Sequence, residues 1–168
     1  MSAILSTCNT YRYRLDRNIQ EYGKTIAFFG INPSTADALE DDATVRKWRG
    51  FTQQMNGKKF IVGNVFSFRS AYVTDLKSTY PLHGDEHFQH LYKIIDEADI
   101  LIPCWGSRWK LNKQLHIFID QLLEILLASN KPVMTLGLTK SKDPKHVLML
   151  PYSTPVRLYT DLIKENPL

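Results

Sequence analysis

Residues 25–34, Thr25-Ile26-Ala27-Phe28-Phe29-Gly30-Ile31-Asn32-Pro33-Ser34, decide the fold of this chain. The first five form a short apolar run that is typical of a buried strand. Glycine and proline then break the extended run, so Asn32 is expected just beyond the carboxyl end of that strand. Ligands of open α/β sheets bind at this rim. The stretch therefore predicts a core strand with a binding site at its carboxyl end.

Strand and helix patterns alternate along the rest of the chain. The expected strands are residues 60–66, 99–103 and 132–136, and the expected helices are 41–55, 86–97, 113–128 and 156–165. The run Tyr11-Arg12-Tyr13-Arg14-Leu15 alternates as an edge strand does. This order predicts an α/β fold, namely a three-layer sandwich with a mainly parallel central sheet. One domain is expected over residues 1–168 because no linker-like shift in composition interrupts the chain.

Composition excludes several classes of protein. With 43% hydrophobic and 23% charged residues, the chain resembles an ordinary globular protein. No apolar segment approaches the roughly 18 residues of a membrane span, and no secretory signal opens the chain, so a cytoplasmic protein without a membrane partner is expected. Two cysteines provide neither a disulfide framework nor a metal site, and His83-x3-His87 lacks a third ligand. We therefore expect no metal, no cofactor and a monomer.

The charge pattern permits contact with nucleic acid without requiring it. The formal net charge is +4 and the isoelectric point is about 9.0. Lys140, Lys142, Lys145 and His146 gather in one late loop. This cluster either forms a solvated surface or grips phosphates near a bound base.

Four loops that follow the predicted core strands share one feature, a glycine beside a polar or aromatic residue. The loops are residues 30–34, 63–70, 104–106 and 137–151. Because the carboxyl ends of parallel strands meet at one rim, the four loops predict a concave binding site there. The alternative is that the glycines serve only as turn residues.

Four residues are the candidate catalytic groups. Asn32 has no suitable pKa to act as a base, but its amide can orient a water molecule or bind a base edge. Asp37 and Asp42 lie within one turn of that loop and can activate water, whereas their structural alternative is to cap a helix. His146 can donate to a negative charge that develops on a departing base, or it is a surface histidine.

The candidate substrate-binding residues come from the same loops. Asn64 carries both a donor and an acceptor and suits a base edge, and Trp105 offers a stacking surface. Each has a structural alternative, as a turn residue or as part of the core. The remaining candidates are Gly30, Ile31, Pro33, Ser34, Lys140 and Lys145.

Five motifs spread over nearly the full length resemble a small bacterial and phage family known as domain of unknown function 1643. They are residues 32–37, 41–46, 63–69, 104–106 and 136–151. The resemblance is specific, but this family carries no established activity.

A more distant resemblance suggests a chemistry. Gly30-Ile31-Asn32-Pro33 is similar to the first motif of the mismatch-specific uracil/thymine-DNA glycosylases, and residues 61–69 resemble a segment of the thermophile-type uracil glycosylases. The resemblance implies that Asn32 holds the hydrolytic water, Asn64 reads the base and His146 stabilises the leaving group. Val147 or Leu148 would be the apolar wedge that enters DNA. Ser34 replaces the usual glycine, and no set of cysteines exists for an iron–sulfur cluster.

The resemblance implies a uracil-DNA glycosylase-like domain that binds a nucleobase. As a hydrolase, it would break the N-glycosidic bond of a damaged or modified base, with nucleic acid or a nucleotide as its partner. Two alternatives remain open. The chain is a non-catalytic nucleotide- or DNA-binding module, or it is an enzyme that acts on a free nucleotide.

Overall fold

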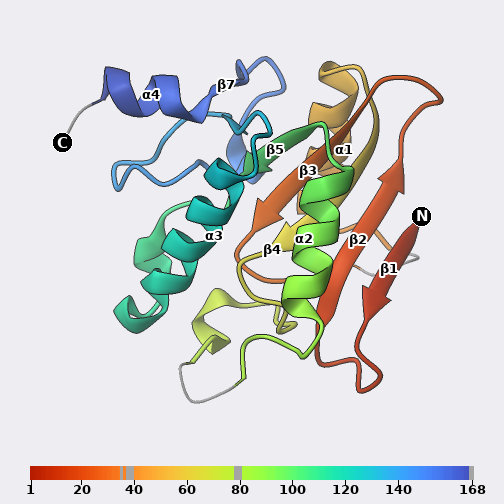
Figure 1. Ribbon diagram of the computed structural model, residues 1–168, viewed down its shortest axis with the longest axis vertical. Helices are drawn as coiled ribbons and strands as arrows, with labels where there is room; N and C mark the ends of the chain where they lie inside the picture. The colour runs from red at the N-terminus through yellow and green to blue at the C-terminus, as the bar shows by residue number, and fades with distance from the viewer. Residues whose placement is uncertain (35, 37–39, 78–80, 167–168) are drawn as a thin grey trace.

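A five-stranded mixed sheet forms the centre of the protein (Figure 1). The computed structural model describes residues 1–34, 36, 40–77 and 81–166. In chain order the strands are β1 (Ser2–Leu5), β2 (Arg12–Asn18), β3 (Lys24–Gly30), β4 (Gly57–Asn64) and β5 (Ile100–Pro103). In space their order is β1-β2-β4-β3-β5. The α/β class predicted from the sequence is confirmed at this level.

The direction of the strands differs from the prediction of a mainly parallel sheet. β3 pairs in parallel with both β4 and β5, but β2 is antiparallel to β4 and β1 is antiparallel to β2. The run at residues 11–15 was predicted to be an edge strand. Residues 12–15 belong instead to β2, which is flanked on both sides, because β1 covers its outer edge.

Four α-helices are found in the described part of the chain. They are α1 (Ala43–Gln54), α2 (His87–Glu97), α3 (His116–Ala128) and α4 (Tyr159–Glu165). The predicted helix over 113–128 begins with a 3₁₀ turn, η3 (Lys113–Leu115), before α3 starts. A second, small sheet pairs β6 (Met134–Thr135) with β7 (Arg157–Leu158). A parallel bridge between Leu101 and Val133 links β5 to the segment that leads into β6.

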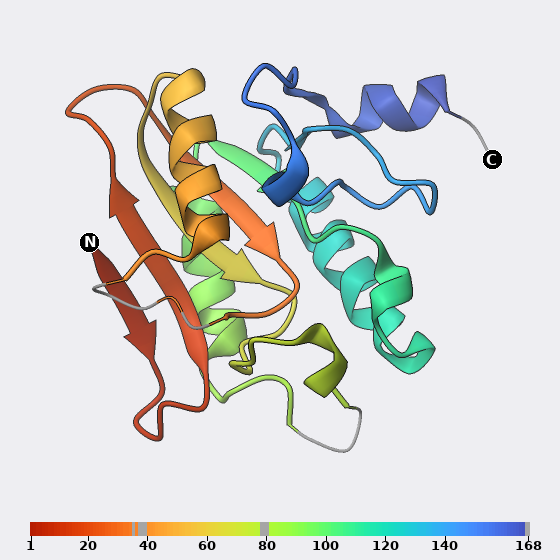
Figure 2. The same ribbon diagram turned by 180° about the vertical axis from the view of Figure 1, so that it is seen from behind.

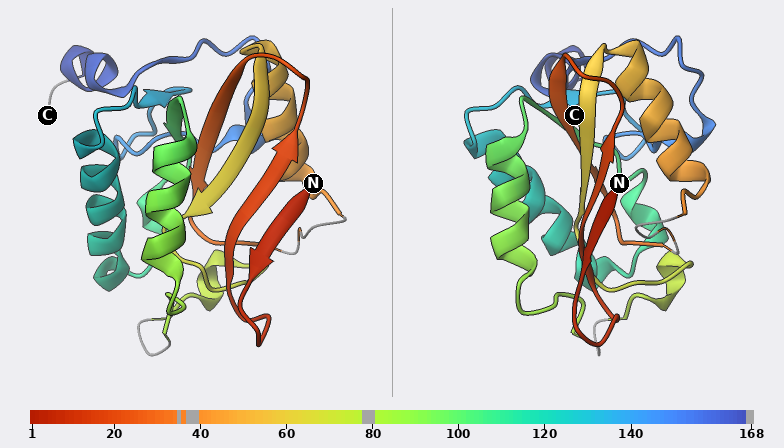
Figure 3. Two further views of the ribbon diagram at one scale, coloured as in Figure 1. Left: turned by 45° about the vertical axis from the view of Figure 1, so that its right-hand side comes forward. Right: turned by 90° about the vertical axis from the view of Figure 1, so that its right-hand side faces the viewer.

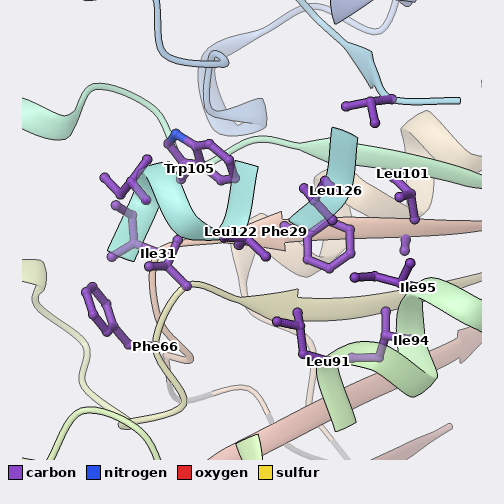
Figure 4. Close-up of a cluster of buried hydrophobic side chains, with 14 of the residues drawn as sticks. Phe29, Ile31, Phe66, Leu91, Ile94, Ile95, Leu101, Trp105, Leu122 and Leu126 are labelled. Atoms are coloured by element: carbon purple, nitrogen blue, oxygen red, sulfur yellow. The ribbon is translucent and has the colours of Figure 1, made fainter. Parts of the chain in front are cut away.

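The helices cover both faces of the sheet. Figure 3 shows α1 on one side of the strands and α2 on the other. Because side chains alternate along a strand, Phe28 packs with Trp48 and Phe51 beneath α1, whereas Phe29 faces the opposite way. Figure 4 shows Phe29 among apolar side chains of α2 and α3, including Ile94 and Leu122. β3 is therefore buried on both faces, as its apolar sequence requires.

The connections reverse direction beside β3. The chain runs from β3 through α1 to β4 on one side, and from β4 through α2 to β5 on the other side of β3. In open α/β sheets such a reversal leaves a crevice at the carboxyl ends of the strands. This crevice is the place where the sequence predicted a site.

A buried charge cluster joins β2 to the segment before α1. The Arg17 guanidinium is fully buried and donates to Asp41 at 2.7 Å, and Arg49 of α1 donates to the same carboxylate at 2.9 Å. Burial alone would raise the pKa of Asp41, but these two arginines hold it below its usual range. Asp41 is thus a structural carboxylate.

A pair of histidines lies at the start of α2, where His87 is the first residue of the helix and is buried, and His83 is half-buried. The rings of His83 and His87 are 4.4 Å apart between centroids, and His83 meets the Val65 carbonyl at 2.9 Å. Burial lowers the pKa of both, and it lowers that of His87 to about 3. No group of three or more metal-ligating side chains occurs in the part of the chain that the structure describes.

None of the described helices is both long enough and apolar enough to span a membrane.

The buried histidines predict that acid destabilises this fold. His87 stays neutral in the folded protein but takes up a proton near pH 6.5 once unfolded, so stability is complete above that pH and is lost as pH falls. We expect the free energy of unfolding to fall by about 1.4 kcal/mol per pH unit for His87 between pH 6.5 and pH 4. Urea unfolding at several pH values checks this, and His87→Gln should flatten the slope. A His87 ring that titrates near pH 6.5 by NMR in the folded protein would contradict it.

Candidate functional site

A pocket of about 340 Å³ opens at the carboxyl ends of β3, β4 and β5. Gly30, Ile31, Asn32 and Ser34 reach it from the end of β3, and Asn64 from the end of β4. The remaining predicted residues in its wall are Asp42 before α1, Trp105 after β5 and His146. Its volume falls within the roughly 300–1,000 Å³ of small-molecule sites. The structure thus brings together eight of the predicted site residues.

Backbone hydrogen bonds hold the strand-end loops together beyond the sheet. Val65 N donates to Gly30 O at 2.9 Å, and Phe66 N donates to Ile31 O at 2.8 Å. On the other side of β3, Cys104 N donates to Phe29 O at 2.8 Å. These bonds continue the parallel pairing for one or two residues. The side chains at the rim are therefore placed by the sheet itself; Figure 2 shows this end of the strands from behind.

Asn32 is held by its amide nitrogen. Nδ2 donates to the carbonyl of Ser70 at 2.9 Å and to that of Pro33 at 3.1 Å. No described residue donates to Oδ1. The side chain is thus oriented by two fixed acceptors, and its oxygen is left to accept from a water molecule or a ligand.

Asn64 is the most unusual polar group in the pocket. Its side chain is only 5% exposed, yet its amide makes no hydrogen bond to another described residue. It faces Gly30 across the β3–β4 pair, and a Cβ at position 30 would lie 3.0 Å from Asn64 Oδ1. Glycine at position 30 therefore leaves room for the amide. Neither atom of the amide is fully enclosed, so both can reach a molecule in the pocket.

His146 lies at the start of the 3₁₀ helix η4 (Val147–Met149). Its Nδ1 accepts from the backbone N–H of Leu148 at 3.2 Å, so the proton of the neutral ring is on Nε2. Burial, aided by the positive charge of Lys110, lowers the pKa of His146, and Asp42 opposes this shift only in part. At neutral pH the residue is a neutral imidazole that offers an Nε2–H donor.

Two tryptophans form the apolar wall. Trp105 is buried in the core around Phe29 (Figure 4), and its indole N–H is buried without a hydrogen-bond partner among the described residues. The Trp48 indole donates to Cys104 Sγ at 3.3 Å. Burial raises the pKa of Cys104 to about 12, so this thiol is no nucleophile at neutral pH.

The two predicted catalytic carboxylates have different outcomes. Asp42 is the N-cap of α1: Oδ1 accepts from Val45 N at 2.8 Å, and Oδ2 accepts from the Ser34 hydroxyl. Both oxygens therefore already have partners. Asp37 lies outside the described residues.

Three predicted substrate-binding residues do not line the pocket. Pro33 contributes only its carbonyl, which accepts from Asn32 and from Ser70 N. Lys140 lines a separate hollow next to α4, and Lys145 is exposed with its side chain over Gly137.

Sequence reasoning missed two basic residues of the pocket wall, Arg12 and Lys110. Arg12 is buried in β2 and donates to the Ala36 carbonyl. Its only signal in the sequence was an arginine alternating with tyrosines, which also fits a solvated edge strand. Lys110 follows the Trp105 loop, and no pattern marked it.

Asp143 fixes the loop that carries His146. This fully buried carboxylate accepts from Arg108 Nε at 2.8 Å and Arg108 N at 2.9 Å, and from the Ser141 hydroxyl at 2.7 Å. Arg108 in turn donates to Asp120 of α3 at 2.9 Å. The late loop is thereby tied to the helix layer, which positions His146 over the pocket.

We expect Asp143→Ala to destabilise the protein by about 2–4 kcal/mol, because it removes a buried carboxylate and leaves partly buried donors of Arg108 and Ser141 without this acceptor. Chemical denaturation checks this value. The matched control is Glu165→Gln, which removes an exposed carboxylate paired with Arg157 and should leave stability unchanged. Equal effects of the two substitutions would show that Asp143 does not anchor the loop.

Comparison with known proteins places the chain in a family. Residues 12–148, well over half of the chain, match the model of a family described as proteins of unknown function, DUF1643. No curated protein matches the chain, and no solved structure matches it either. The matched range contains all the pocket residues described above. The chain therefore belongs to the DUF1643 family.

Proposed function

We propose that the pocket binds a nucleobase and that the protein hydrolyses the N-glycosidic bond of a damaged or modified base, as a uracil-DNA glycosylase-like enzyme does. The observation that carries this proposal is the amide of Asn64, which lines the pocket and makes no hydrogen bond to another described residue. An amide presents a donor and an acceptor in one plane and thereby suits the edge of a base. The apolar walls of Trp48 and Trp105 suit its faces.

Asn32 has the chemistry required for the attacking water. Its oxygen can accept a hydrogen bond and so orient a water molecule, but an amide cannot remove a proton. The glycosidic bond must therefore break ahead of attack, as in other glycoside hydrolyses that pass through an oxocarbenium-like state. The water oxygen then bonds to the sugar carbon and its proton leaves to solvent.

His146 has the chemistry required for the leaving group. The bonding electrons of the glycosidic bond pass to the base, which develops negative charge before it takes up a proton. A neutral imidazole with Nε2–H directed at that charge stabilises it in a site shielded from water. Removal of one such donor costs roughly 10²–10³ in rate in other enzymes.

The fold supports this reading. The pocket lies where the chain connections reverse beside β3, with α1 and α2 on opposite faces of the sheet. This arrangement fits the three-layer architecture that the resemblance implies.

The second candidate is a binding module without catalysis. It is favoured by Asp42, whose two oxygens are already engaged by Ser34 and Val45, so that the described residues of the pocket offer no free carboxylate. The same pocket would then hold a base without breaking a bond. Release of free base distinguishes the two candidates.

The decisive experiment compares wild type with Asn32→Ala. Both are incubated with duplex and single-stranded oligonucleotides that contain normal, deaminated and hydroxymethylated bases, and with the matching free nucleotides. We expect the variant to lose at least about 10²-fold in the rate of base release, because the water loses its orienting acceptor. Binding by wild type without release would establish the non-catalytic module. Unchanged turnover in Asn32→Ala would refute the proposed mechanism.

A second prediction separates DNA from a free nucleotide. Val147 is fully buried and cannot be the wedge, whereas Leu148 is 38% exposed at the pocket and Met149 is 88% exposed beside it. An apolar side chain there would replace the stacking of a flipped base. We expect Leu148→Ala to slow base release from duplex DNA about tenfold or more, but not from single strands or nucleotides. Equal loss on all substrates would contradict a wedge.

A further inference from the structure

A second hollow adjoins the pocket. It encloses about 260 Å³, and its wall contains Asn9, Thr10 and Arg69. Ser34, Ser70 and Ala71 line both hollows. The two therefore meet along one shared wall, with Asn64 and His146 on one side of it and a guanidinium on the other.

Arg69 differs from the other arginines whose ion pairs the structure shows. Arg14, Arg17, Arg49, Arg108 and Arg157 each lie within ion-pair distance of a carboxylate. Arg69 has no carboxylate partner among the described residues, and the hydrogen bond of its side chain to a described residue runs from Nη1 to the Asn9 carbonyl at 3.3 Å. Its Nε is buried and lacks a partner in the described part of the chain. Nη2 also makes no hydrogen bond to a described residue and, unlike Nε, is not enclosed, so a positive charge with an accessible donor borders the hollow.

The backbone that carries this guanidinium is held by hydrogen bonds. Arg69 N donates to Thr10 O at 3.0 Å, and the neighbouring Ser70 N donates to Pro33 O at 2.9 Å. The Ser70 hydroxyl is already engaged, since it donates to Asp75 and accepts from Tyr72 N at 3.1 Å. Among the residues that line this hollow, Arg69 is the charged one.

We infer that Arg69 binds a phosphate of the nucleotide whose base occupies the adjoining pocket; this inference rests on the proposed function. A guanidinium offers parallel donors that match two phosphate oxygens. A nucleotide joins its base to a phosphate through one sugar, and the shared wall of Ser34, Ser70 and Ala71 separates the two hollows in the same way. The sequence predicted that Lys140 and Lys145 bind phosphate. Neither lysine lines either hollow, so we assign this role to Arg69.

The test measures binding of three probes: deoxyuridine, its 5′-monophosphate and a short single-stranded oligonucleotide that contains deoxyuridine. We expect Arg69→Gln to weaken binding of the monophosphate about ten- to a hundredfold and to leave deoxyuridine unchanged. Arg69→Lys should recover part of this loss, and Lys140→Gln, the matched control, should have no effect. A loss confined to the oligonucleotide assigns the phosphate to a DNA strand, and a loss with both phosphate-bearing probes assigns it to any nucleotide.

Two outcomes overturn the inference. One is that Arg69→Gln binds the phosphate-bearing probes as wild type does. The other is that it weakens deoxyuridine equally, because Arg69 would then act only on the structure of the loop.

A separate experiment tests the phosphate site without a nucleobase in the pocket. Inorganic phosphate is titrated into wild type while the Nε–H signal of Arg69 and the side-chain amide of Asn64 are followed by NMR. We expect the Arg69 signal alone to shift and saturate. If phosphate shifts Arg69 but none of the nucleoside probes binds, the proposed function fails and the phosphate site stands. If phosphate leaves the Arg69 signal unmoved, the inference is overturned whichever base the pocket takes.

Discussion

The parallel pairing of β3 with both β4 and β5 is the constraint on which the rest of the molecule depends. β3 is buried on both faces, so Phe28 and Phe29 each anchor one helix layer. The same hydrogen-bond ladder extends past the strand ends, where Gly30, Ile31 and Phe29 accept from the neighbouring loops. One continuous set of backbone hydrogen bonds therefore positions both the apolar core and the polar rim. A change that shifted the register of β3 would displace Asn32 and Asn64 together.

The distribution of hydrogen bonds separates structural from available polar groups. Asp41, Asp42 and Asp143 lie near the site in the sequence or in space, yet each already accepts from arginines or backbone donors. Around the two hollows, the described groups without partners include the Asn32 oxygen, the Asn64 amide, the Trp105 indole N–H and the Arg69 Nε. They are neutral groups and one cation. We infer that the chemistry of the site rests on orientation and on stabilisation of negative charge, because among the described residues of the pocket Asp42 is engaged through both oxygens and His146 through Nδ1.

The sequence predicted the parts of this arrangement that follow from local patterns. The apolar runs of β3, β4 and β5 and the stripes of α2 and α3 indicate buried elements, and glycine with proline marks their ends. β1 could not be predicted, because its pairing with β2 is a tertiary event without a local signal. The burial of Arg12 and Arg17 could not be predicted from hydropathy, because their guanidinium groups donate to residues that are distant in the sequence. Asn32, Asn64 and His146 could be placed at one rim from the sequence. Lys110 and Arg69 could not, because the conformation of their loops brings them to the two hollows.

An amide that no neighbouring group engages adds little to the stability of the empty protein, and Asn64 is such a group. A leucine of similar size would bury more apolar surface at that position. The amide nevertheless stands opposite Gly30, whose missing side chain leaves it space, and a glycine inside a strand weakens that strand. A purely structural role gives no reason for this coincidence, whereas a ligand that pairs with the amide gives a reason for both residues.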